Sequence, residues 1–180
     1  MARTIVVLGA RNLGGAIVDH FLALGWNAAA VARTEDTLQA DLAAFHGWTM
    51  AVAEQAFTFL STGARALRQS GGGTLVQITG GSSRRAMPGK GLWAAGAFAT
   101  RALVQAAAQE QRAQSIHVAL LAVDATIESP KTAAFTGDQP ANALADQGQV
   151  AEAVAFLGGQ RERAWTHELV VTPAGDRWVP

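Results

Sequence analysis

The feature that most constrains the fold is the alternation of short apolar runs with longer helical segments along the whole chain. The first run, Thr4 to Gly9, is β-branched, continuously apolar and ends in glycine, as expected of a strand buried on both faces of a parallel sheet. Strands that alternate with helices pack as a parallel sheet with helices on its faces. We therefore predict an α/β fold built on a doubly wound parallel sheet.

Glycines, prolines and capping residues set the predicted boundaries of the elements. We predict strands at 4–9, 27–32, 74–79, 116–123 and 169–172, and helices at 13–24, 51–68, 92–111 and 149–157. Thr34 can cap one more helix. The segment 124–146 holds Pro130, Gly137 and Pro140, which predicts a loop that could hold one helical turn.

Length and composition exclude several classes of protein. The 180 residues suit one domain over 1–180, and 14 basic residues balance 14 acidic ones, so neither nucleic acid nor an acidic membrane is an expected partner. The absence of Cys removes disulfides and thiolate chemistry, and the four scattered His residues predict no metal site. No signal peptide and no membrane-length apolar run are evident, so we expect a cytoplasmic protein with a small-molecule ligand.

The turn after the first strand has the composition of a dinucleotide site. Glycines there let the backbone approach a pyrophosphate that rests on the N-terminus of the following helix. Asn12 can supply a left-handed turn residue. The candidate cofactor residues in this turn are Gly9, Arg11, Asn12, Leu13 and Gly14. The alternative is an ordinary strand-to-helix turn, because a degenerate glycine motif is a weak signal.

Six segments, taken together and in their order along the chain, carry a resemblance to a known family. They are VVLGARNLGGAIVDHFLALGWNAAAVAR, GWTMAVAEQAFTFL, GGGTLVQITGGSS, GKGLWAAGAFATRALVQAAA, VAEAVAFLGG and AWTHELVV. They resemble the short-chain dehydrogenase/reductase family, whose fold is of the Rossmann type. No one motif is intact, so the resemblance depends on the sum of the matching runs. The resemblance implies an oxidoreductase ancestry and a nicotinamide cofactor. Arg33 and Thr34 follow the second strand, where the family places a basic residue for a 2′-phosphate, so NADP(H) is the implied cofactor, unless Arg33 is only a solvated residue at a helix start.

The family's chemistry resembles a proton relay of Asn, Ser, Tyr and Lys side chains. On this chain the resemblance places those four roles at Ala53, Gly80, Trp93 and Ala97, and the chain contains no Tyr at all. Trp93 and Ala97 are four residues apart and still share one helix face. The indole of Trp93 carries an N–H donor that does not titrate near neutral pH. We therefore predict that ordinary carbonyl reduction is lost and that any NADP(H) binding is weak or vestigial.

Three polar groups near the expected cleft are further candidates. Asp124 ends a strand at the side where ligands bind to parallel sheets, so it is the best remaining acid or base, with a capping role as the alternative. The hydroxyl of Ser82 could reach the cleft, although a loop role is the simpler interpretation. The basic residues at 84, 85 and 90 could receive an anionic substrate, or form a solvated charged loop.

A second departure from the family concerns the middle of the chain. Leu38 is followed within ten residues by Trp48, which already begins the family's central helix, so two βα units are absent, about 60 residues at about 30 each. Their loss would leave unpaired backbone groups in the core. Either the first strand closes against the strand that begins at Thr74, or the sequence omits a segment.

The sequence leaves three functional hypotheses. The chain is a degenerate relative that keeps the fold and weak NADP(H) binding, a repurposed enzyme with non-redox chemistry such as isomerisation, cyclisation or elimination, or a divergent reductase with an unusual proton donor. Small residues on the helices at 51–68 and 92–111 also predict a homodimer or homotetramer through these helices, as the family is similar in pairing them.

Overall fold

The computed structural model describes residues 4–8, 23, 27–31, 41–128 and 132–176. The chain divides into two compact units, residues 1–42 and 43–180, which are described separately. One domain over 1–180 therefore stays a prediction. In the first unit, β1 (Thr4–Leu8) pairs in parallel with β2 (Asn27–Val31), with Thr4 opposite Asn27. This parallel pairing agrees with the predicted parallel sheet.

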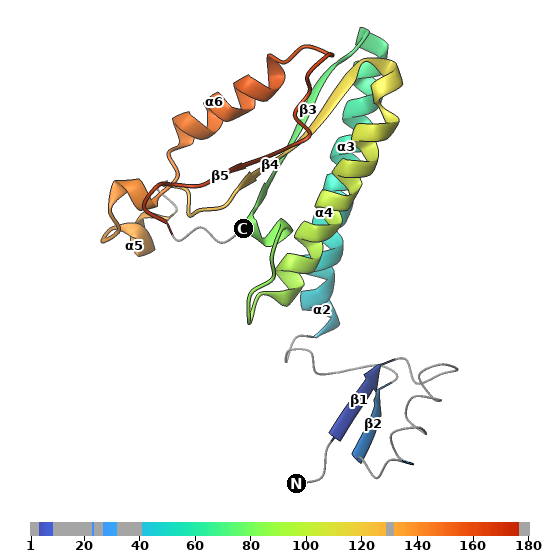
Figure 1. Ribbon diagram of the computed structural model, residues 1–180, viewed down its shortest axis with the longest axis vertical. Coiled ribbons are helices and arrows are strands. Elements are labelled where there is room, and N and C mark those ends of the chain that lie inside the picture. Colours follow the sequence, from blue (N-terminus) through green and yellow to red (C-terminus); the bar gives the residue numbers. More distant parts are fainter. Residues whose placement is uncertain (1–3, 9–22, 24–26, 32–40, 129–131, 177–180) are drawn as a thin grey trace. The chain divides into compact units, whose positions relative to one another are not determined.

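The second unit carries the remaining elements as a parallel three-stranded sheet with helices (Figure 1). The strands lie in the order β3-β4-β5. The helices and strands of this unit are α2 (Leu42–Phe45), α3 (Ala51–Ser70), β3 (Gly73–Gly80), α4 (Gly91–Glu110), β4 (Ile116–Val123), α5 (Ala133–Thr136), α6 (Gln147–Gly158) and β5 (Glu168–Val171). The result is a truncated Rossmann-like α/β fold, as the sequence predicts.

The sheet is covered on both faces, which explains why its central strand is apolar throughout. Every residue of β4 is buried. On one face β4 packs with β3, α3 and α4 around Leu60, Leu75 and Val104, and on the other it packs against α6 around Leu157 (Figure 1). Burial of apolar surface on both faces is the main stabilising contribution to such a layered fold.

Local sequence signals explain the ends of the long helices. Helix α3 ends at Gly71, whose φ of 88° is left-handed and whose N–H donates to the carbonyl of Leu67. Helix α6 begins after Asp146, whose carboxylate accepts a hydrogen bond of 2.8 Å from the backbone N–H of Gln149. The segment between β4 and α6, predicted as a loop with one helical turn, contains α5 and a short 3₁₀ turn, Ala141–Ala143.

The predicted gap in the middle of the chain is confirmed. Between β2 and α3 the described residues form only α2 and a π-helical turn, His46–Met50, and only nine residues, 32–40, separate β2 from Asp41. Within each unit the described strands pair as β1 with β2, and as β3 with β4 and β4 with β5. Whether the first strand closes against the strand from Thr74 stays a prediction.

Candidate functional site

Three of the four positions that the resemblance assigns to catalysis meet at one cleft. Gly80 at the end of β3, and Trp93 and Ala97 on α4, line an open cleft of about 700 Å³. The fourth position, Ala53, is half-buried on α3 between Val52 and Ala56, and Val52 and Ala56 both line the cleft. Three of the assigned positions therefore line one cleft, and none of the four residues carries a titratable group.

Close packing at the start of α4 positions Trp93. The ring of Trp48, in the π-helical turn before α3, lies 5.3 Å from that of Trp93 in an edge-on arrangement. The hydroxyl of Thr49 donates to the carbonyl of Leu92 at 2.9 Å. A Cβ at Gly96 would lie 2.6 Å from the carbonyl oxygen of Trp48, so only glycine permits this approach. These contacts fix the indole at the mouth of the cleft.

The two serines that follow β3, Ser82 and Ser83, are not among the described residues that line the cleft. Ser83 is fully buried and its Oγ donates to the carbonyl of Gly80 at 2.9 Å. Ser82 is half-buried in the same 3₁₀ turn, Gly81–Ser83, and is not among the described residues that line the cleft. A direct role for Ser82 stays a prediction.

Asp124 forms an ion pair beside the end of β3. It is not among the described residues that line the cleft, although its chain neighbours Val123 and Ala125 are. Both carboxylate oxygens of Asp124 accept hydrogen bonds from Arg85, with Nη2–Oδ1 at 2.9 Å. The hydrogen bond to Asp124 raises the pKa of the Arg85 guanidinium, so this cation persists throughout the neutral range.

A second arginine of the same loop is also paired. Nη1 of Arg84 lies 2.7 Å from a carboxylate oxygen of Glu168, the first residue of β5, and Arg101 on α4 reaches the same carboxylate at 3.0 Å. Of the three loop cations considered for an anionic substrate, Arg84 and Arg85 are therefore each held by a carboxylate of the chain itself. Lys90 is exposed immediately before α4.

The lining of the cleft is uncharged in the described residues. Its large apolar side chains include Phe59, Ile78 and Trp93, and its polar groups are Gln55, Gln77, Thr79 and Thr100. The Thr100 hydroxyl donates to the carbonyl of Gly96, and the Gln77 amide donates to the carbonyl of Ile78. The sequence did not single out Phe59 or Ile78, because each is typical of an ordinary core residue in its helix or strand.

Solved structures with the same fold were found, although the sequence matches no family model and no curated protein. An acetoin dehydrogenase from Enterobacter cloacae aligns over 100% of this chain and 99% of its own, with a TM-score of 0.65 at 14% identity. A short-chain dehydrogenase from Rhodopseudomonas palustris aligns over 95% and 98%, with a TM-score of 0.51 at 21% identity. A Beutenbergia cavernae protein with bound NADP aligns over 96% of both chains, with a TM-score of 0.63 at 19% identity.

This chain has the short-chain dehydrogenase fold. The family positions assigned from the resemblance accordingly lie where the fold brings β3 and α4 together. The residues assigned to a nicotinamide cofactor, Gly9, Arg11, Asn12, Leu13 and Gly14 with Arg33 and Thr34, lie outside the described residues.

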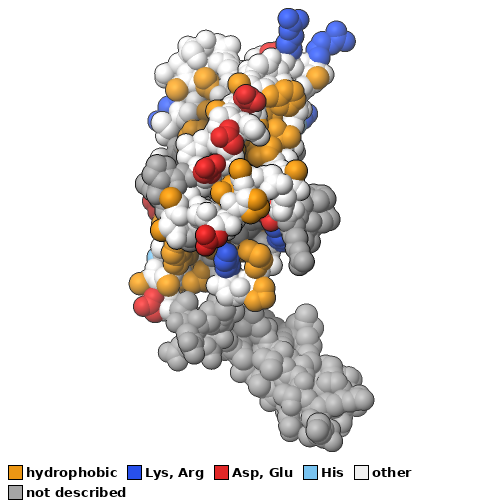
Figure 2. Space-filling model, turned by 90° about the vertical axis from the view of Figure 1, so that its left-hand side faces the viewer, with side chains coloured by type: hydrophobic (Ala, Val, Ile, Leu, Met, Phe, Trp, Pro, Cys, Tyr) orange, Lys and Arg blue, Asp and Glu red, His pale blue; other side chains and the backbone are white. Residues whose placement is uncertain are grey.

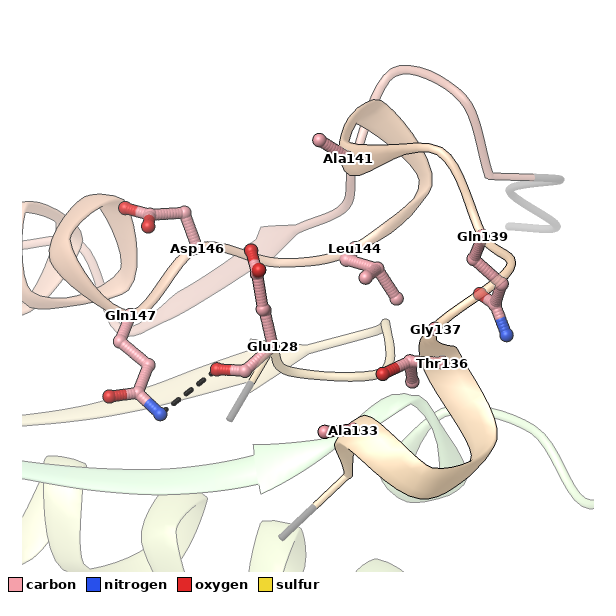
Figure 3. Close-up of a pocket in the computed structure, with 9 residues that line it drawn as sticks. All are labelled: Glu128, Ala133, Thr136, Gly137, Gln139, Ala141, Leu144, Asp146 and Gln147. Carbon is pink, nitrogen blue, oxygen red and sulfur yellow. Dashed lines mark hydrogen bonds between the residues drawn. The ribbon is translucent and has the colours of Figure 1, made fainter. Parts of the chain in front are cut away.

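A second pocket, of about 540 Å³, lies in the segment between β4 and α6 of this short-chain dehydrogenase fold (Figure 3). The Glu128 side chain points into the space between Asp146 and Leu144, and Gln147 donates its amide to the backbone carbonyl of Glu128 at 3.0 Å (Figure 3). Asp146 is already used as the cap of α6. None of the residues proposed from the sequence lines this pocket, so the cleft beside Trp93 is the better candidate site.

The described residues contain neither a cluster of metal ligands nor a membrane-spanning helix. No group of three or more His, Asp or Glu side chains in that part of the chain could hold a metal ion. No described helix combines the length and the apolar character that crossing a bilayer requires. The face displayed in Figure 2 carries single acidic side chains spread among hydrophobic ones, so charge is not concentrated there.

Proposed function

We propose that this protein is a ligand-binding member of the short-chain dehydrogenase/reductase family that does not reduce carbonyl compounds. The observation that carries the proposal is the presence of Trp93, Ala97 and Gly80 at the cleft, where the family resemblance implies Tyr, Lys and Ser. A proton relay needs titratable groups within hydrogen-bond reach of the reacting atom. The indole N–H of Trp93 cannot exchange a proton near neutral pH.

The remaining candidate acid does not restore this chemistry. Asp124 is held by Arg85 and is not among the described residues that line the cleft, whereas its neighbours Val123 and Ala125 are. A carboxylate that accepts two hydrogen bonds from a guanidinium is occupied by that ion pair and is not free to act as a general base. Loss of general acid–base help typically costs about 10² to 10⁴-fold in rate.

The test is an assay of NADPH oxidation with a panel of ketones and aldehydes at high enzyme concentration. We expect no turnover above the background of a heat-treated sample. The comparison variant combines Trp93→Tyr, Ala97→Lys, Gly80→Ser and Ala53→Asn, because groups that act as a unit rescue little one at a time. Robust turnover by the unmodified protein would refute the proposal and favour a divergent reductase, and Asp124 would then be the first residue to replace.

A second candidate function is non-redox chemistry in the same cleft, such as isomerisation, cyclisation or elimination. It is favoured by the retained volume of about 700 Å³ beside a site that has lost its relay. Shape and fixed dipoles would then have to carry catalysis. Native mass spectrometry of the purified protein tests this, since a co-purified metabolite without nucleotide supports it and a co-purified nucleotide favours the first proposal.

We further propose weak binding of NADP(H), with Arg33 and Thr34 near the 2′-phosphate and the glycine turn at 9–14 near the pyrophosphate. The support is the sequence pattern and the bound NADP of the Beutenbergia cavernae protein. Calorimetric titration of NADPH and NADH against the unmodified protein and Arg33→Ala provides the test. We expect NADPH to bind more tightly and the variant to lose that preference, because Arg matches phosphate geometry with two donors. Tighter binding of NADH would overturn this assignment.

We also propose a cytoplasmic homodimer or homotetramer formed through α3 and α4. Phe57 on α3 and Phe98 on α4 are exposed aromatic side chains, at 59% and 41% respectively. Exposed aromatic residues are enriched at protein interfaces. Light scattering at micromolar concentration should give a dimer or tetramer, and Phe98→Glu should shift it toward the monomer. A monomer for the unmodified protein contradicts the proposal.

A further inference from the structure

We propose that the cleft beside Trp93 selects an uncharged, largely apolar molecule that carries a flat ring. The inference rests on the proposed function, in that it names the class of ligand for that same cleft. A volume of about 700 Å³ lies within the range of about 300–1,000 Å³ that is usual for small-molecule sites.

Large apolar side chains stand partly open to solvent around this cleft. Phe59 on α3 is 41% exposed, Ile78 on β3 is 48% exposed and Trp93 on α4 is 46% exposed. They come from three different elements that converge on one concave surface, where a ligand would remove their apolar area from water. Two of them are aromatic, and aromatic rings pair favourably with another ring in offset or edge-on geometry.

The charges nearest to the cleft are already neutralised by partners of their own. No charged side chain and no His line the cleft within the described residues. Asp124 is paired with Arg85, and Arg84 with Glu168. A charged ligand group that enters an apolar site without a counter-charge loses its hydration with nothing to replace it. The cleft therefore discriminates against anions and cations alike.

The polar groups of the lining are amides and hydroxyls, which suit uncharged ligand groups. Gln77 donates its amide to the carbonyl of Ile78, which leaves its side-chain oxygen as an acceptor, and Gln55 is exposed at the rim on α3. The indole N–H of Trp93 can act as a donor. One hydroxyl or carbonyl group on the ligand would match this set.

The experiment compares three ligands that share one ring system and differ in charge. Calorimetry would measure the binding of 2-naphthol, of 2-naphthoate and of 2-naphthylmethylammonium to the full chain at neutral pH. We expect 2-naphthol to bind about tenfold or more tightly than either ion, because the ions pay for desolvation without a partner. Equal or tighter binding of either ion overturns the inference, and so does the absence of binding by all three.

Matched variants test whether the cleft itself is responsible. Phe59→Ala should weaken 2-naphthol binding about tenfold, whereas Phe57→Ala, an exposed phenylalanine of the same helix outside the lining, should leave it unchanged. Gln55→Glu keeps the side-chain shape and should shift the preference toward the ammonium ligand. Identical behaviour of Phe59→Ala and Phe57→Ala would overturn the inference. The proposed function fails separately, in the NADPH assay, whichever ligand the cleft prefers.

Discussion

The two sides of the three-stranded sheet differ in where their charged side chains lie. Beside β3, where the cleft lies, the described lining is uncharged and includes Gly80, Trp93 and Ala97, the positions that the family resemblance assigns to catalysis. Beside β5, Glu168 is held by both Arg84 and Arg101 at 2.7 to 3.0 Å. Charged side chains beside β5 are therefore paired with other residues of the chain, and charged side chains are absent from the described lining of the cleft.

Near β5 lies a buried histidine whose ring packs against an aromatic side chain and forms a hydrogen bond with the backbone. His117 on β4 is 1% exposed, and its ring is stacked on that of Trp165 at 5.1 Å. Its Nε2 lies 2.9 Å from the carbonyl oxygen of Thr166, so Nε2 is the protonated nitrogen and the ring donates this hydrogen bond. His167 packs edge-on against it and lies within hydrogen-bond distance of Arg112.

The difference teaches that polar residues alone do not identify the site in this molecule. Ion pairs and the histidine stack gather beside β5, which is a pattern that resembles an active site in composition. The ion pairs and the Nε2 of His117 have partners within the fold, whereas the buried Nδ1 of His117 has no hydrogen-bond partner among the described residues. The cleft at the positions assigned from the resemblance is the region whose described lining lacks charged groups.

The largest effect is expected from Gly96→Leu, on the cleft side. A side chain there would overlap the backbone of Trp48 and the side chain of Val52 and would push α4 away from the turn before α3. Overpacking of this kind costs about 3 kcal/mol in the free energy of unfolding. Urea unfolding followed by circular dichroism measures it. Ala95→Leu, at an exposed position of the same helix, is the control and should change stability little.

His117→Ala, on the β5 side, is expected to cost about 2 kcal/mol of unfolding free energy. The substitution removes the ring that stacks on Trp165. It also leaves the partly buried carbonyl of Thr166 without the hydrogen bond that the His117 ring donates. The same urea titration measures the loss. If the contrast is right, the variant keeps its 2-naphthol affinity. A loss of affinity together with full stability would mean that the histidine stack belongs to the ligand site.

The Asp124–Arg85 pair should show a coupling free energy of about 1 kcal/mol, because both side chains are only partly exposed. A double-mutant cycle of Asp124→Asn and Arg85→Gln, by urea unfolding, isolates this term. Both single variants should bind 2-naphthol as the unmodified protein does. A zero coupling combined with a change in ligand binding upon Asp124→Asn would instead place Asp124 in the site.

The smallest effect is expected from Trp93→Tyr. Restoring one hydroxyl should give no measurable NADPH-dependent reduction, because Ala97 and Gly80 still lack the cation and the orienting hydroxyl. The decrease in NADPH absorbance in the presence of the ketone and aldehyde panel measures this reduction. Stability should also change little, since a tyrosine ring can keep part of the edge-on contact with Trp48. Clear turnover would show that a hydroxyl at position 93 is sufficient for reduction, without a cation at position 97 or a hydroxyl at position 80.

Much of the fold followed from the sequence because strands and helices are local patterns. The strand at Ile116–Val123 has the predicted bounds, and the helices predicted at 51–68 and 92–111 are observed as Ala51–Ser70 and Gly91–Glu110. Apolar runs and glycine stops act over a few residues, so they can be read without knowing the rest of the molecule. Together with the resemblance, the same local spacing placed Gly80, Trp93 and Ala97 at one cleft.

Only the tertiary structure decided which groups face each other. Asp124 was the best acid or base in the sequence, but its ion pair with Arg85, 39 residues earlier in the chain, could not be foreseen from local patterns. Phe59 and Ile78 became cleft residues because α3 and β3 converge there, and neither has a local signal for that role. Ion pairs and pocket linings depend on which side chains from distant segments meet, and the hydrophobic pattern along the chain fixes only which faces are buried.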